Sequence, residues 1–132
     1  MIVSEDSKEL VPYTEFKKGL RESLSLNEGD KPKAIAETYV TFTRTLREQI
    51  VDDERKRANA EREEREAQTL ADHLGRGKST AGLDDETLTA LSNALTNISA
   101  FMGSTEGKMP DELSRLYSTV NSQIIEKRQQ NY

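Results

Sequence analysis

Residues 52–66 (DDERKRANAEREERE) most constrain the fold, because twelve of these fifteen side chains are charged and none is large and apolar. A helical pattern of apolar residues leads into the segment through residues 34–51, and a weaker one continues through residues 67–74. Neither glycine nor proline interrupts residues 33–74. This pattern predicts one long helix from about residue 31 to residue 74, whose charged middle cannot be buried in the core of a monomer.

The apolar side chains at the start of this predicted helix form one stripe. Their spacings of three and four residues are those of a helix face, and the stripe consists of Ile35, Tyr39, Phe42, Leu46 and Ile50. Further along, the same face carries charged residues and alanines, so it does not continue as a coiled-coil core. A continuous helix of this length would reach about 65 Å at 1.5 Å per residue. The alternative is a broken helix that folds back near Asn59.

Short-range ion pairs are the expected support for the charged segment. Acidic residues precede basic ones by four positions at Asp52–Lys56, Asp53–Arg57 and Glu61–Arg65. Each such pair stabilises a helix by about 0.2–0.5 kcal/mol. We therefore expect a helical but solvent-exposed rod over residues 52–74.

A shorter helix is predicted before the long one. Residues 1–11 are expected to be irregular, with Pro12 in the first helical turn, and residues 27–30 form a turn with Asp30 as the following N-cap. The helix shows one apolar face, made of Tyr13, Phe16, Leu20 and Leu24. We expect it to pack antiparallel on the first half of the long helix through the aromatic side chains, and the alternative is that these form an exposed patch.

The last third of the chain predicts a helical hairpin over residues 83–125. Residues 75–82 contain three glycines and form the preceding hinge. Asp84 is a suitable N-cap, and the first helix is expected to end at Gly103. Its apolar face comprises Leu88, Leu91, Leu95, Ile98 and Met102, and that of the second helix comprises Leu113, Leu116, Tyr117, Val120 and Ile124.

Together these patterns predict an all-α single domain over residues 1–132 that is extended rather than globular. Its parts are an N-terminal helical pair (12–51), a charged rod (52–74), a glycine-rich hinge (75–82) and a C-terminal hairpin (83–125). Leu, Ile, Val and Phe make up only 27 of 132 residues, at the edge of the range typical of disorder. We therefore expect a second copy or another protein to share the core.

Charge and composition exclude several classes of protein. The net charge of −5 argues against general affinity for nucleic acid or an anionic membrane, since both require a positive field. There is no cysteine, and hence no disulfide, thiolate zinc site or thiol nucleophile. The N-terminal residues do not form a secretory signal, and no segment is apolar enough to span a bilayer. We expect a cytoplasmic protein, or part of a virion assembled in the cytoplasm.

No motif predicts catalysis, a cofactor or a metal site. Gly77-Lys78-Ser79 matches the end of a phosphate-binding loop, but Asp72 stands where that motif requires its first glycine. The only histidine, His73, has no carboxylate three or four residues away, so a metal site is not expected there. We therefore predict no catalytic, cofactor-binding or metal-binding residues.

The sequence predicts a non-enzymatic structural or assembly protein that binds itself or another protein. A viral or phage structural, scaffolding or connector component is one class that fits. The expected protein interface comprises Ile35, Tyr39, Phe42, Leu46, Ile50, Leu88, Leu91, Leu95, Ile98, Leu116, Val120 and Ile124. The alternatives are a small regulatory binder of a cellular protein and, less favoured, a nucleic-acid-binding accessory protein with contacts at Arg55, Lys56, Arg57, Arg76 and Lys78.

Overall fold

The computed structural model describes the backbone of residues 5–50, 52–76, 79–105 and 108–130, and these residues form five helices and no strand. The helices are α1 (Glu5–Leu24), α2 (Lys31–Gln49), α3 (Glu54–Arg76), α4 (Asp85–Thr105) and α5 (Asp111–Gln130). The prediction of an all-α chain is thus confirmed.

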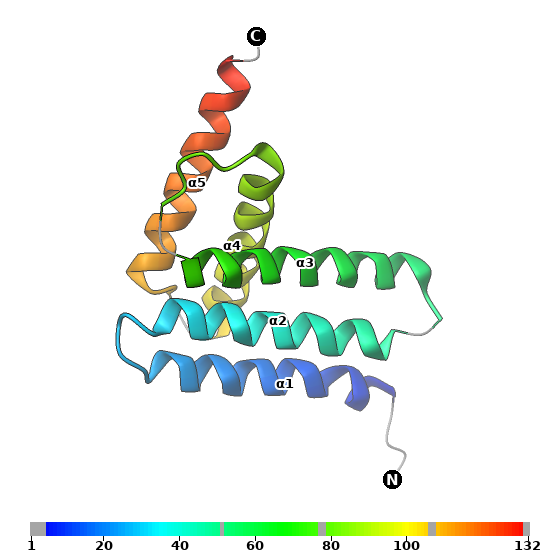
Figure 1. The fold of residues 1–132 in the computed structure, drawn as a ribbon. Coiled ribbons are helices and arrows are strands. Elements are labelled where there is room, and N and C mark those ends of the chain that lie inside the picture. Colours follow the sequence, from blue (N-terminus) through cyan, green and yellow to red (C-terminus); the bar gives the residue numbers. More distant parts are fainter. Residues whose placement is uncertain (1–4, 51, 77–78, 106–107, 131–132) are drawn as a thin grey trace.

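The five helices are arranged as a layer of three and a pair of two (Figure 1). Helices α1, α2 and α3 run antiparallel, side by side, and form the helix layer. Helices α4 and α5 form the helix pair, which stands across the layer and contacts it mainly through α3. One cluster of buried side chains draws on all five helices, so the layer and the pair share a core.

The first helix begins earlier than expected. We predicted residues 5–11 to be irregular, but α1 already starts at Glu5, so Pro12 lies inside the helix. Proline removes one backbone hydrogen bond there, because it has no N–H to donate. The predicted packing of α1 on α2 is confirmed, with the Phe16 and Phe42 ring centroids 4.4 Å apart.

A glycine allows α1 and α2 to approach closely. A Cβ atom added at Gly19 would lie 2.6 Å from Cγ2 of Thr38 on α2, which is closer than unbonded carbon atoms pack. The Thr38 hydroxyl is held in place because it donates to the Ala34 carbonyl at 2.8 Å and lies 3.3 Å from the Ser23 hydroxyl. The helix-weakening glycine in the middle of α1 is therefore explained by packing.

The prediction of one continuous long helix is wrong, because the chain leaves helical geometry after Gln49 and reverses direction. Ile50 is extended, with φ −88° and ψ 104°. Asp53 then caps α3: the Lys56 amide donates to its carboxylate at 3.1 Å and the Arg57 amide to its carbonyl at 2.9 Å. We expected Asp53 to support a continuous helix through an ion pair, but it starts a new one. The reversal precedes Asn59, where the alternative placed it.

The charged segment therefore packs against its own chain instead of forming a rod. Helix α3 lies along α2, and the residues of α3 that are buried are Ala60, Glu66, Ala67, Leu70 and Ala71. Small alanine side chains let two helices approach closely, so α3 needs few large apolar residues to join the core. Within the described part of residues 52–66 only Ala60 and Glu66 are buried, so the charged middle stays largely outside the core, as the sequence predicted. Residues 54–59 remain exposed.

The helices of the pair start where the sequence predicts and end later. Asp84 caps α4, since the Thr87 amide donates to its carboxylate at 2.8 Å, and hydrogen bonds from the Thr87 side chain and amide lower the pKa of Asp84. Gly103 does not end α4, which continues to Thr105. Helix α5 likewise continues beyond residue 125 to Gln130. There the Lys127 ammonium donates to the Leu83 carbonyl at 2.7 Å, which ties the end of α5 to the start of α4.

The chain exposes more surface than is usual for its mass. Its accessible surface is 8765 Å². A compact monomer of 14.9 kDa typically exposes about 7,000 Å². In Figure 1 no other helix lies on the side of α1 that faces away from α2.

Candidate functional site

Most of the predicted interface residues lie in the core of the chain itself. Those classed as buried are Ile35, Tyr39, Phe42, Leu88, Leu91, Leu95, Ile98, Leu116 and Val120. The remaining three, Leu46, Ile50 and Ile124, are partly exposed. A partner interface through these residues stays a prediction, and a partner of this folded chain could reach only the last three directly.

The structure does not bring the predicted nucleic-acid contacts together. Arg55, Lys56 and Arg57 are exposed in the first turns of α3, whereas Arg76 is its last residue. The two groups are separated by most of a 23-residue helix, about 30 Å. Arg57 also forms an ion pair with Glu61 at 3.6 Å. Lys78 lies outside the described residues.

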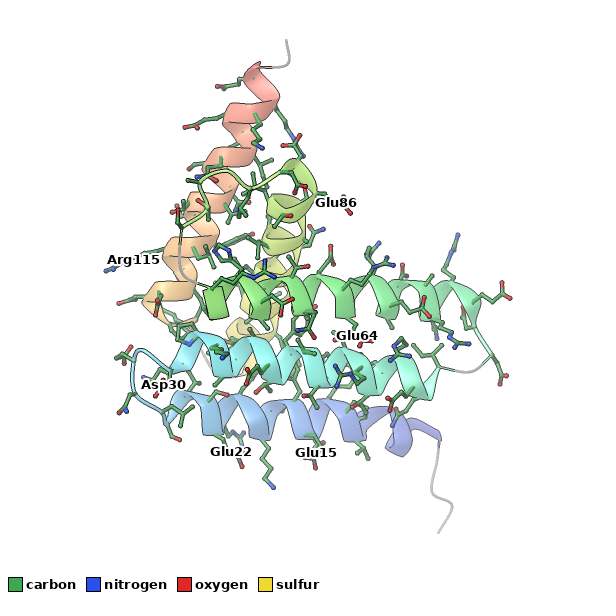
Figure 2. All side chains as sticks on the ribbon, in the orientation of Figure 1. Glu15, Glu22, Asp30, Glu64, Glu86 and Arg115 are labelled. Atoms are coloured by element: carbon green, nitrogen blue, oxygen red, sulfur yellow. The ribbon has the colours of Figure 1, made fainter. Side chains whose placement is uncertain are left out.

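A three-residue charge cluster, made of Arg44, Arg47 and Glu64, joins α2 to α3, and Figure 2 shows Glu64 between these two helices. Arg47 Nε lies 2.5 Å from one carboxylate oxygen of Glu64, and Arg44 Nε lies 3.3 Å from the other. Both guanidinium groups lower the pKa of Glu64, mainly through the hydrogen bond from Arg47. The cluster holds the C-terminal half of α2 against the N-terminal half of α3. In that half of α3, Ala60 is the only buried residue.

A polar seam runs between the helix layer and α4. The Asn93 amide donates to the buried Glu66 carboxylate at 2.6 Å, and the Asn97 amide donates to the Tyr39 hydroxyl at 2.9 Å. Burial raises the pKa of Tyr39 well above its usual range, so its hydroxyl stays protonated. Glu63 is also half-buried here, and loss of water raises the pKa of its carboxyl. These contacts fix the position of α4 on the layer through directional bonds.

Neutralising the neighbouring residues Glu63 and Glu64 should change stability in opposite directions. Glu64→Gln should lower the free energy of unfolding at about pH 7 by roughly 0.2–1 kcal/mol for each ion pair lost. Glu63→Gln should raise it, because the folded state disfavours the charged form of Glu63. Urea titrations of both variants and the parent chain measure the two differences.

Two causes are involved, the ion pairing of Glu64 and the burial of Glu63, and the pH dependence of each variant's stability tests them. The folded pKa of Glu64 is the lowered one, so its contribution is present above the unfolded pKa and lost as pH falls through the folded pKa. The folded pKa of Glu63 is raised, so its unfavourable contribution begins to fall as pH drops through the folded pKa and is gone below the unfolded pKa. Both differences should therefore shrink towards about pH 3. A loss of stability in Glu63→Gln at neutral pH would contradict this assignment.

One surface hollow lies where three parts of the chain meet. It has a volume of about 540 Å³ and is lined from the α1–α2 turn, the end of α3 and the start of α5 by Glu28, Gly29, Leu74, Asp111, Glu112, Arg115, Leu116 and Thr119. Its acidic side chains are partly balanced, since Lys31 binds Glu28 at 2.7 Å. A hollow of about 400 Å³ on another face contains His73, Arg76 and Ser79.

Comparisons with protein-family models, with curated proteins and with solved structures found no match to this chain. Among the described residues, no three or more His, Cys, Asp or Glu side chains are grouped so that they could hold a metal ion. No helix in the described part of the chain combines the length and apolar character needed to cross a membrane.

Sequence reasoning missed the polar residues that connect the helices. The Arg44–Arg47–Glu64 cluster joins residues 17 and 20 positions apart, and the bond between Asn97 and Tyr39 spans 58 positions. Only the reversal after Gln49 makes the first of these contacts feasible. Asp53 was an available signal for that reversal, because Asp is a good N-cap residue and the β-branched Ile50 and Val51 stand three and two positions before it.

Proposed function

We propose that this chain is a non-enzymatic helical protein that acts by binding protein chains, either a second copy of itself or a larger complex. The observation that carries the proposal is the accessible surface of 8765 Å². This surface exceeds the value typical of the mass by about 1,750 Å², which is about twice the roughly 800 Å² that each partner contributes to a standard protein–protein interface. We infer that helix faces which no other helix of the chain covers are available for binding.

The small supply of apolar side chains no longer supports the expectation of a partner. A poor supply of apolar side chains suggested that a second chain must complete the core, but one chain already buries a common core. Partner binding is therefore proposed for a folded protomer that keeps its own structure. A structural, scaffolding or connector role in a virus or phage, within the cytoplasm or a virion assembled there, is the biological setting we propose.

The test is the mass of the chain in solution over a wide range of concentration. Light scattering combined with small-angle scattering should give masses above 14.9 kDa that rise with concentration, and a shape built from crossed layers. A constant mass of one chain, together with salt-sensitive one-to-one binding of a cellular protein, would favour the alternative of a regulatory binder.

Nucleic-acid binding remains the second alternative, resting only on the exposed basic residues at the start of α3. It is tested by neutralising Arg55, Lys56, Arg57, Arg76 and Lys78 together. Unchanged retention on DNA or RNA would remove these residues from consideration.

A further inference from the structure

Two serines of the chain stand three residues after an arginine, which is the spacing that arginine-directed serine kinases select. They are Ser79, after Arg76, and Ser118, after Arg115, and no other serine or threonine of the sequence follows an arginine at this distance. Both serines are exposed. Sequence and exposure therefore suit the two equally, and the structure around each decides which one a kinase can use.

Ser79 lies between two helices. Helix α3 ends at Arg76 and α4 begins at Asp85, and residues 79–84 belong to no helix. Residues 77 and 78 lie outside the described part of the chain. A kinase binds its substrate as an extended segment, so the residues around the serine must leave regular structure. For Ser79 and its arginine only the last residue of α3 has to open, and helix ends open at small cost.

Ser118 lies well inside α5, which extends from Asp111 to Gln130. Its neighbours Leu116 and Val120 are buried in the common core. Drawing the chain around Ser118 into an extended form would break the helix on both sides of the serine and remove both apolar side chains from the core. The arginine spacing at Ser118 is therefore not usable in the folded chain.

We propose that Ser79 is a phosphorylation site for an arginine-directed serine kinase, with ATP as the phosphoryl donor. The hydroxyl oxygen of Ser79 bonds to the γ-phosphorus of ATP, while the bond between that phosphorus and the bridging oxygen of ADP breaks. ADP leaves with the electron pair of that bond, and the hydroxyl proton passes to the catalytic aspartate of the kinase. Modification of Ser79 does not depend on the proposed binding function, because the kinase acts on the single folded chain.

The surroundings of Ser79 provide space and a cation for the phosphate. Ser79 lines the hollow of about 400 Å³ together with His73 and Arg76 from the last turn of α3. The added phosphate carries a charge of about −1.5 to −2 at pH 7, and the Arg76 guanidinium is a suitable donor to its oxygens. Asp72 opposes this charge from the same hollow, although its carboxylate accepts a hydrogen bond from the Gln68 amide at 3.0 Å. The phosphorylated chain therefore keeps its fold.

The test is phosphorylation of the full chain by an arginine-directed serine kinase, the calcium/calmodulin-dependent protein kinase, with ATP. Mass spectrometry of the intact chain and of its fragments should find one phosphate, on Ser79. Ser79→Ala should abolish incorporation, because the neighbouring Thr80 is 6% exposed. Arg76→Ala should slow it by about tenfold or more, since the kinase loses a charged hydrogen-bond partner. Ser118→Ala is the matched control and should incorporate phosphate at the rate of the parent chain.

Each other outcome would overturn the proposal. Phosphate on Ser118 in place of Ser79, or an unchanged rate in Arg76→Ala, would contradict the assignment of the site. A parent chain that takes up no phosphate, while a peptide substrate in the same mixture is phosphorylated, would contradict the accessibility of Ser79. Circular dichroism checks that all variants are folded, and a loss of helix on phosphorylation would contradict the fit of the phosphate to the hollow.

Discussion

Replacing Phe16 with alanine should lower the free energy of unfolding by about 3–5 kcal/mol, the usual cost of removing a buried phenylalanine. The Phe16 ring is 2% exposed and lies where α1, α2 and α4 meet. Its centroid is 4.4 Å from that of Phe42 and 4.5 Å from that of Phe101. Truncation leaves a cavity among these rings and separates the layer from the end of α4.

Val11→Ala is the matched control for this substitution. Val11 lies on the same helix, but it is 53% exposed. Its replacement should therefore change the free energy of unfolding by no more than about 0.5 kcal/mol. Urea denaturation followed by circular dichroism measures both variants. A loss below about 1 kcal/mol in Phe16→Ala would mean that α1 does not belong to the common core.

The positions of α1, α2, α4 and α5 could largely be predicted from the sequence because each of these helices repeats large apolar side chains at three and four residues. Helix α4 is the clearest case: Leu88, Leu91 and Leu95 are fully buried, and Asp84 caps the helix as its residue type suggests. Residues close together in the sequence were enough to predict α4, because its cap and its apolar face lie within the same few turns. The helix ends were less predictable, since α4 passes Gly103 without stopping.

The arrangement of α2 and α3 could not be obtained in the same way. The residues of α3 that face the core are mainly alanines, which give a weaker apolar signal than leucine although Ala67 is fully buried. The reversal also uses neither glycine nor proline, and depends on the extended Ile50 and the cap at Asp53. Such a break is favoured by the long-range packing that follows it, which no local pattern reports.

The candidate sites show the same limit. Ile35, Leu91 and Val120 were predicted to contact a partner because they lie on strongly apolar faces, but those faces pack against one another. The two serines that follow an arginine, Ser79 and Ser118, look alike in the sequence, and only the helix bounds distinguish them. A surface available for binding can be identified only once the helices that cover each other are known.

The continuous helix and the reversed α2–α3 pair differ most in the distance between the start of α2 and the end of α3. The chain contains no cysteine, so Lys33→Cys and Gly75→Cys would introduce the only thiols for a pair of spin labels. A continuous helix would place these residues about 63 Å apart. In the reversed arrangement they are neighbours, since a Cβ atom at Gly75 would lie 4.0 Å from Cε of Lys33.

We expect the label separation at these positions to be below about 25 Å, less than half the length of the continuous helix. Labels at Lys33 and Glu48, both on α2, should give about 22 Å in either arrangement and serve as the control. A dominant distance near 60 Å in the first pair would restore the continuous helix. It would also remove the Arg44–Arg47–Glu64 cluster, because those contacts need α2 and α3 side by side.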